Sequence, residues 1–214
     1  MTSYAPTFGF GRTLAGGFLA LGLVFFAALN GAQAGDRKSV EGATAFLKDF
    51  GDKAVAMLSQ DGLSDTDRKA ELRRLIKAGF ELPVIGRFVL GKHWRKATDE
   101  ERTEYSALFE DFLTATYARR LSSYSGEVLK VGSAREASAK GLILVESKIE
   151  RQAGADVKVD WRLRQTQGAW RIVDVVVEGV SMAQAQRSEF DAVIRQGGGQ
   201  IQALLKRLRS ATNT

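Results

Sequence analysis

The chain has 214 residues, with 31 Lys and Arg against 25 Asp and Glu, a formal net charge of +6 and no cysteine. Without cysteine, the sequence excludes disulfides, thiol nucleophiles and thiolate metal sites. A basic balance of this size favours partners with anionic surfaces.

Residues 1–34 follow the order of a secretory signal peptide. Arg12 is their one charge, the run from Leu14 to Leu29 is almost wholly apolar, and Ala32-Gln33-Ala34 matches a small-x-small cleavage pattern. The run is shorter than the roughly 20 apolar residues that span a bilayer. We therefore expect cleavage after Ala34 and a mature part, 35–214, that forms one domain. Export removes that part from nucleic acid, so its net charge of +5 favours anionic lipid or acidic protein surfaces.

Apolar residues at helical spacing predict four helices in the first half of the mature part. Ser64 is a plausible N-cap for the second, and Pro83 breaks the chain before the third. Thr98 and Glu101 form a capping box for the fourth, which is long and rich in aromatic side chains. The expected ranges are about 40–58, 65–78, 84–90 and 99–121.

The periodicity then changes to that of strands. Four strands are expected at about 128–131, 142–149, 157–163 and 170–180, separated by turns that contain glycine. Two more helices, about 183–195 and 200–209, follow on either side of three consecutive glycines. Helices first and strands afterwards predict an α+β fold, with helices packed on a curved four-stranded antiparallel sheet.

The last two expected strands differ in pattern. In the third, Val157, Val159, Trp161 and Leu163 alternate with charged residues. In the fourth, both sides are apolar, with Trp170, Ile172 and Val176 on one and Val173, Val175 and Val177 on the other. A strand that is apolar on both faces needs cover on both. Helices can cover one face, and the other needs a closing helix, a curl of the sheet or a bound guest.

Few residues suggest catalysis. His93 is the one histidine, and beside Lys92 and Trp94 it is expected at the surface. Asp174 and Glu178 share a strand face but lie roughly 13 Å apart at about 3.3 Å per residue, too far for a glycosidase pair. We expect them to pair with basic side chains instead. The sequence therefore predicts no enzyme activity, no metal and no cofactor.

Two longer stretches resemble a known family. Phe88–Leu121 contains VLG, an aromatic residue and A-T-x-x-x-R, and Val159–Phe190 contains W-x-x-x-D-V-x-x-E-G-V-S followed by R-x-x-F. In this order they resemble the MlaC, or toluene-tolerance, family of periplasmic phospholipid carriers over nearly all of the mature part. The stretch AQAQR after Met182 is also similar to the branch associated with hopanoid biosynthesis.

The resemblance implies an NTF2-like α+β domain with a deep apolar pocket between sheet and helices. It implies a periplasmic carrier that moves phospholipid between an outer-membrane lipoprotein complex and an inner-membrane ABC transporter with an MCE-domain subunit. A hopanoid cargo is the alternative. We expect a monomer.

Spacing and resemblance together predict which residues bind cargo and partners. The lipid-binding residues are expected to be Ile85, Phe88, Val89, Tyr105, Phe109, Phe112, Val159, Trp161, Leu163, Val173, Val175 and Val177. Basic residues at helix ends suit the helix dipole, and together they also predict a docking rim for acidic or anionic surfaces. These are Arg119, Arg120, Lys206, Arg207 and Arg209.

Overall fold

The computed structural model describes residues 21–60, 62–121, 124–139 and 141–212, with side chains from Ser39 onwards. Of the expected signal peptide, residues 1–20 lie outside the described residues and residues 21–34 are described only as helical backbone. The chain divides into two units, residues 1–37 and 38–214, and the second contains the sheet and its helices. Within the described ranges, no helix is both long and apolar enough to cross a bilayer.

Two helices, those with the predicted caps Ser64 and Thr98, begin where expected. Ser64 Oγ accepts from the Asp67 backbone N at 3.1 Å, and Thr98 and Glu101 complete their reciprocal box at 2.9 and 3.2 Å. The third helix begins at Leu82, two residues before the expected start, so the predicted break at Pro83 is wrong: Pro83 lies in the first turn, where a missing N–H costs nothing. The helices are α1 (Leu21–Leu58), α2 (Asp65–Gly79), α3 (Leu82–Leu90), the 3-10 helix η1 (Gly91–Arg95), α4 (Asp99–Leu121), α5 (Met182–Gln196) and α6 (Ile201–Thr212).

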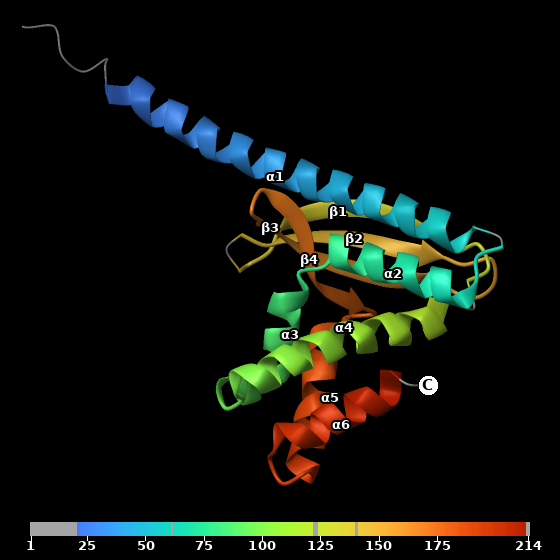
Figure 1. The fold of residues 1–214 in the computed structure, drawn as a ribbon. Helices are drawn as coiled ribbons and strands as arrows, with labels where there is room; N and C mark the ends of the chain where they lie inside the picture. The colour runs from blue at the N-terminus through green and yellow to red at the C-terminus, as the bar shows by residue number, and fades with distance from the viewer. Residues whose placement is uncertain (1–20, 61, 122–123, 140, 213–214) are drawn as a thin grey trace, which may run out of the picture. The chain divides into compact units, whose positions relative to one another are not determined.

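The sheet is antiparallel, with its strands in chain order (Figure 1). The strands are β1 (Val128–Glu136), β2 (Ile143–Glu150), β3 (Val157–Thr166), β4 (Ala169–Val177) and β5 (Val180–Ser181). The expected fourth strand is wrong at its end, because Glu178 and Gly179 take positive φ values of 49° and 81° and turn the chain back. The described sheet therefore has five strands, not four. The α+β class is confirmed, and the NTF2-like assignment stays a prediction.

A β-bulge in β4 explains why residues expected on opposite faces of this strand are both apolar. Trp161 pairs with Val175 but Leu163 pairs with Ile172, so the register shifts by one residue between them. Paired residues of antiparallel strands share a face, and one extra residue reverses the alternation. Ile172 and Val175 therefore lie on the same inner face, and the expected separation of these residues is wrong. The opposite face carries Asp174 and the charged residues of β3.

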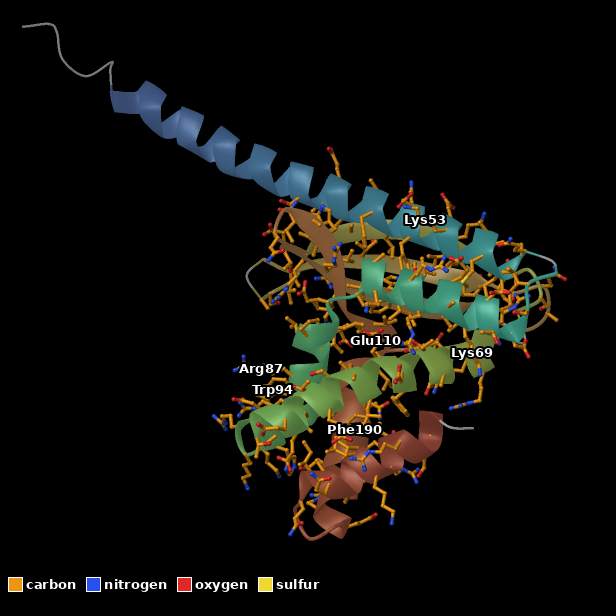
Figure 2. The ribbon with its side chains drawn as sticks, viewed as in Figure 1. Lys53, Lys69, Arg87, Trp94, Glu110 and Phe190 are labelled. Atoms are coloured by element: carbon orange, nitrogen blue, oxygen red, sulfur yellow. The ribbon has the colours of Figure 1, made fainter. Side chains whose placement is uncertain are left out.

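The structure has two separate hydrophobic clusters, one on the inner face of the sheet and one among the helices α3, α4, α5 and α6. The first packs α1 against the sheet: Ala43, Leu47, Ile143, Val145, Leu163 and Ile172. The second lies among α3, α4, α5 and α6, where the Phe190 ring meets three aromatic rings of α4 at 5.7–6.3 Å (Figure 2). Its fully buried members include Val89, Tyr105, Ile194, Leu204 and Leu205. Phe80, between α2 and α3, packs against both clusters.

An ion-pair cluster joins η1 to α5. His93 is only 6% exposed, so its expected surface position is wrong. Its Nε2 lies 2.8 Å from Asp191 Oδ1, and Lys92 Nζ lies 3.0 Å from the same oxygen. The hydrogen bonds from His93 and then Lys92 lower the pKa of Asp191 from 3.8 to about 2.

The Asp191 cluster predicts a specific loss of stability in acid. Because the folded state holds the pKa down, the carboxylate contributes stability above about pH 4, and that contribution is lost as the pH falls towards 2. Asp191→Asn should be less stable than the wild type at neutral pH, with the gap closing between about pH 4 and 2. Urea unfolding across that range measures the gap. Asp52→Asn, at an exposed position of α1, is the control; a gap that is constant with pH would contradict the prediction.

Candidate functional site: an apolar cavity between two clusters

A cavity of about 580 Å³ lies between the two hydrophobic clusters. Phe50, Phe80 and Trp161 border it from the first cluster, and Ile85 and Phe109 from the second. The described lining is mostly aliphatic and aromatic. Such a cavity falls in the size range of ligand sites and offers a polar ligand few partners over most of its wall.

Eight of the twelve residues predicted to bind lipid line this cavity. On the sheet, the bulge places β3 and β4 residues side by side, since Val159 pairs with Val177 and Trp161 with Val175. On the helices, α3 and α4 contribute the rest. The eight are Ile85, Val89, Phe109, Phe112, Val159, Trp161, Val175 and Val177.

The other four predicted residues are not in the lining. Phe88 is 42% exposed and lies under the Arg187 guanidinium, 5.1 Å from its ring centre. Tyr105 and Leu163 have no exposed surface and fill the two clusters instead. Val173 is the residue that the register shift leaves without a partner on β3. Spacing alone could not separate a side chain that faces a cavity from one that fills a core.

The first two helices contribute lining residues that were not predicted from the sequence. The side of α1 and α2 that faces the cavity carries apolar residues at helical spacing, a signal that was visible in the sequence but indicated only a buried face. Further lining residues that were not predicted come from these helices and from β1, β2 and α5: Phe50, Ala54, Leu58, Leu72, Ile76, Leu129, Ile149 and Met182.

A short hydrogen-bond chain fixes the Trp161 ring in the wall. Trp161 Nε1 donates to Ser147 Oγ at 2.9 Å, and Ser147 Oγ donates to the Val159 carbonyl at 2.6 Å. Ser147 is 7% exposed. The one polar atom of the indole is thus satisfied by the sheet, and its apolar surface is left for the cavity.

Buried Asp174 connects the same wall to α5. It pairs with Arg162, accepts from Ser181 Oγ at 2.7 Å and accepts from the Ala183 backbone N at 3.1 Å. Its carboxylate thereby lies at the N-terminus of α5, where the helix dipole favours a negative charge. The expected basic partner is confirmed for Asp174. Glu178 instead accepts from the backbone N of Lys158 at 2.6 Å.

Polar lining residues gather on the second half of α4, the segment after it, and one face of α5. The first group is Thr116, Tyr117, Arg120, Tyr124 and Glu127, and the second is Gln186 and Glu189. The Arg120 guanidinium lies 5.8 Å from the centre of the Tyr117 ring, and burial raises the pKa of Tyr117 above its ordinary value of 10.0. Nowhere in the described chain do three or more His, Cys, Asp or Glu side chains gather as a metal site would need.

The five basic residues predicted to dock a partner differ in their immediate surroundings. Arg120 lines the cavity, and Arg209 forms an ion pair with Glu104 of α4. Arg119, Lys206 and Arg207 are exposed on α4 and α6. Their role in docking stays a prediction.

The fold and its lining define the class: an α+β protein with a largely apolar cavity between its sheet and its helices. The sequence model of the family described as MlaC protein matches residues 48–210, and the chain belongs to this family. The resemblance seen in the two sequence stretches is thereby confirmed.

The relatives differ in how much of their length is matched. The chain is 23% identical over 135 residues to the intermembrane phospholipid transport system binding protein MlaC of Haemophilus influenzae, covering 62% of each. It is 29% identical over 107 residues to the toluene tolerance protein ttg2D of Pseudomonas putida, covering 50% of this chain and 49% of that one. The chain thus spans about half to three-fifths of the length of these two relatives.

A solved structure confirms the fold. The phospholipid-binding protein from Ralstonia solanacearum, solved in complex with a phospholipid, superposes with a TM-score of 0.69 at 20% identity. The match covers 80% of this chain and 97% of that one.

The hydrogen bond between Trp161 and Ser147 should contribute measurably to the free energy of unfolding. Ser147→Ala removes the acceptor of the Trp161 N–H and should lower the free energy of unfolding by about 1–3 kcal/mol, because a buried donor is left unpaired. Urea unfolding measures the loss. In a Trp161→Phe background, which has no indole N–H, the same change should cost clearly less. An equal cost in both backgrounds would contradict the role of this hydrogen bond.

Proposed function

We propose that this protein is a periplasmic carrier that holds the acyl tails of a phospholipid in the cavity between its two clusters. The observation that carries the proposal is the cavity itself, apolar over most of its wall, in a chain of the MlaC family. The names of two relatives support it, since one is a phospholipid transport binding protein and another was solved with a phospholipid.

Transfer free energies explain why a carrier needs such a wall. A lipid that leaves a bilayer loses about 0.8 kcal/mol for each CH₂ group exposed to water. Two tails with about thirty CH₂ groups therefore cost roughly 20 kcal/mol unless protein replaces the bilayer. Aromatic and aliphatic side chains from both clusters provide that replacement, and the protein needs no catalytic group for this function.

The proposed carrier moves lipid between the two membranes after export through its cleaved signal peptide. Its proposed partners are an inner-membrane ABC transporter with an MCE-domain subunit and an outer-membrane lipoprotein complex, and it acts as a monomer. The exposed basic residues of α6 support contact with anionic membrane or acidic protein surfaces.

Native mass spectrometry of protein purified from cells tests the cargo. A co-purifying diacyl phospholipid supports the proposal. A bound hopanoid would support the alternative cargo in place of phospholipid. Protein that never carries lipid would contradict both.

A charge placed in the cavity wall should abolish lipid retention. Val159→Asp, Val175→Asp and Phe109→Asp each put a carboxylate among apolar groups, where burial of the charge is strongly disfavoured. Lipid extracted from each purified variant is quantified against protein. Val180→Asp makes the same change at a valine that is 55% exposed and outside the lining, and should retain lipid. Folded wall variants with normal lipid content would contradict the site.

The basic residues of α6 should affect transfer without affecting binding. Lys206→Gln with Arg207→Gln removes two exposed charges and should slow lipid transfer to anionic vesicles at low salt. The difference from the wild type should disappear as salt is raised, while the amount of bound lipid stays constant. Arg209 is left intact because it pairs with Glu104. Equal transfer rates for the variant and the wild type at every salt concentration would contradict a role of these residues in transfer.

A further inference from the structure

The outer face of the sheet, opposite the inner face that packs against α1, carries arginines at the end where β3 turns into β4. Arg162 and Arg164 lie on the outer face of β3, because Leu163 between them is completely buried on the inner face. Arg171 of β4 is the cross-strand partner of Arg164, so the two side chains share this face. All three arginines therefore lie on one side of one hairpin.

Ion pairing differs between the two ends of the outer face. At the end where β3 begins, Lys148 and Lys158 each pair with neighbouring carboxylates, with N to O distances of 2.9–3.6 Å. Arg162, nearer the middle of the strand, pairs with Asp174. At the other end, Arg164 and Arg171 form no ion pair with any residue that the structure describes.

Arg164 and Arg171 are like charges placed directly opposite each other. In such a pair the Cβ atoms are about 5 Å apart, and like charges at this distance are destabilising. Arg171 Nη1 donates to the Trp170 carbonyl at 3.0 Å, whereas Arg164 donates no hydrogen bond within the described chain, and its Nε is buried. Glu81, which bonds to β4 through its backbone N, pairs with neither arginine. The described chain thus holds a repulsive pair that none of its own carboxylates relieves.

A hydroxyl on the same face also lacks a partner. Thr166 lies two residues after Arg164 on β3, so the two side chains point to the same side of the sheet. Thr166 Oγ1 is buried and forms no hydrogen bond with any described residue. A buried polar group without a partner is costly, so acceptor oxygens beside Arg164 and Thr166 would be stabilised.

The chemistry of this surface favours the carboxylates of a protein over a membrane. Guanidinium groups bind carboxylates through two parallel hydrogen bonds, and two of them fixed on neighbouring strands match two acidic side chains of one segment. Surfaces that bind a bilayer also present apolar side chains. In the described chain, the large apolar side chains that are exposed are Phe88, Val128 and Val180, and none of them lies in the hairpin segment 162–171.

We propose that the outer face of the sheet beside the β3–β4 turn binds an acidic segment of a partner protein. Arg164 and Arg171 pair with its carboxylates, and Thr166 donates a hydrogen bond to them. None of these three residues lines the cavity, so the proposal does not depend on what the cavity holds. Binding also relieves the repulsion between the two arginines, which is a cost only in the free protein.

The test titrates protein purified from cells into a fluorescent oligoglutamate peptide, with an oligoglutamine peptide of the same length as the neutral probe. Fluorescence anisotropy measures the Kd, and shifts of backbone amide NMR signals locate the contact. Wild-type protein should bind oligoglutamate, less tightly as salt is raised, with the largest shifts in residues 162–171. Arg164→Gln with Arg171→Gln should weaken binding about ten-fold or more, the effect of losing one charge-assisted hydrogen bond.

Matched variants separate this site from the net charge of the protein. Arg87→Gln with Arg95→Gln removes the same charge from exposed arginines of α3 and η1 and should change the Kd less than about two-fold (Figure 2 labels Arg87). Thr166→Val keeps the side-chain shape and should weaken binding about three-fold. Without peptide, Arg164→Gln should melt no lower than the wild type, because it removes a like-charge contact. An arginine that only stabilised the fold would give a lower melting temperature.

Three results would overturn the proposal. The first is wild-type protein that does not bind oligoglutamate, or binds oligoglutamine equally well. The second is an equal loss of affinity in the Arg87 and Arg95 variant, or NMR shifts that are largest outside residues 162–171, since net charge alone would then explain binding. The third is binding to phosphatidylglycerol vesicles through Arg164 and Arg171 without binding to the peptide, which would favour a membrane instead. Each leaves the proposed function standing, because the co-purified cargo tests that separately.

Discussion

The structure depends on how the apolar face of one antiparallel sheet is covered. Helix α1 covers the part of that face around Leu163 and Ile172, and together they form a closed cluster. The part around Val159 and Val177 faces a second cluster that belongs to α3, α4, α5 and α6. The two clusters are in contact over only part of their surfaces. Helix α1 therefore packs closely on one part of this face, and a cavity adjoins the other part.

The bulge in β4 links this arrangement to the start of α5. By shifting the alternation, it keeps Val175 and Val177 on the inner face of the sheet and places Asp174, which also borders the cavity, on the opposite face. Asp174 can then pair with Arg162 of β3 and accept from Ser181 Oγ and from the backbone N–H of Ala183 in α5. One irregular residue therefore positions both a hydrophobic wall and the helix that carries Gln186 and Glu189.

Local signals in the sequence predicted most of the secondary structure. The caps at Ser64 and Thr98 depend on neighbouring residues only, and both helices begin where expected. The turn at Glu178 and the bulge in β4 were missed, because each depends on strand pairing that the pattern of side chains does not reveal. His93 was misplaced for a similar reason, since its partner Asp191 is 98 residues away in the sequence.

The sequence predicted that the candidate site is apolar, but it did not predict which apolar residues border the cavity. The same apolar spacing that placed Val159 and Phe109 in the wall also included Tyr105 and Leu163, which are completely buried. Whether an apolar side chain fills a core or faces a cavity depends on how closely helices from distant parts of the chain approach, and spacing carries no information on that distance. The polar residues of α4 were missed as a group because each is ordinary for a helix on its own.

The position of Phe80 has a consequence for the energetics of an empty protein. Its ring packs against both clusters, and the backbone beside it bonds to β4, with Glu81 N donating to the Ile172 carbonyl at 2.9 Å. Any apolar molecule that fills the cavity would join two small cores into one continuous interior. Occupancy and folding would then be thermodynamically linked, and the melting temperature would rise with the concentration of free ligand. Such a rise would continue after the cavity is full, because the stabilisation depends on the ratio of the free ligand concentration to the dissociation constant.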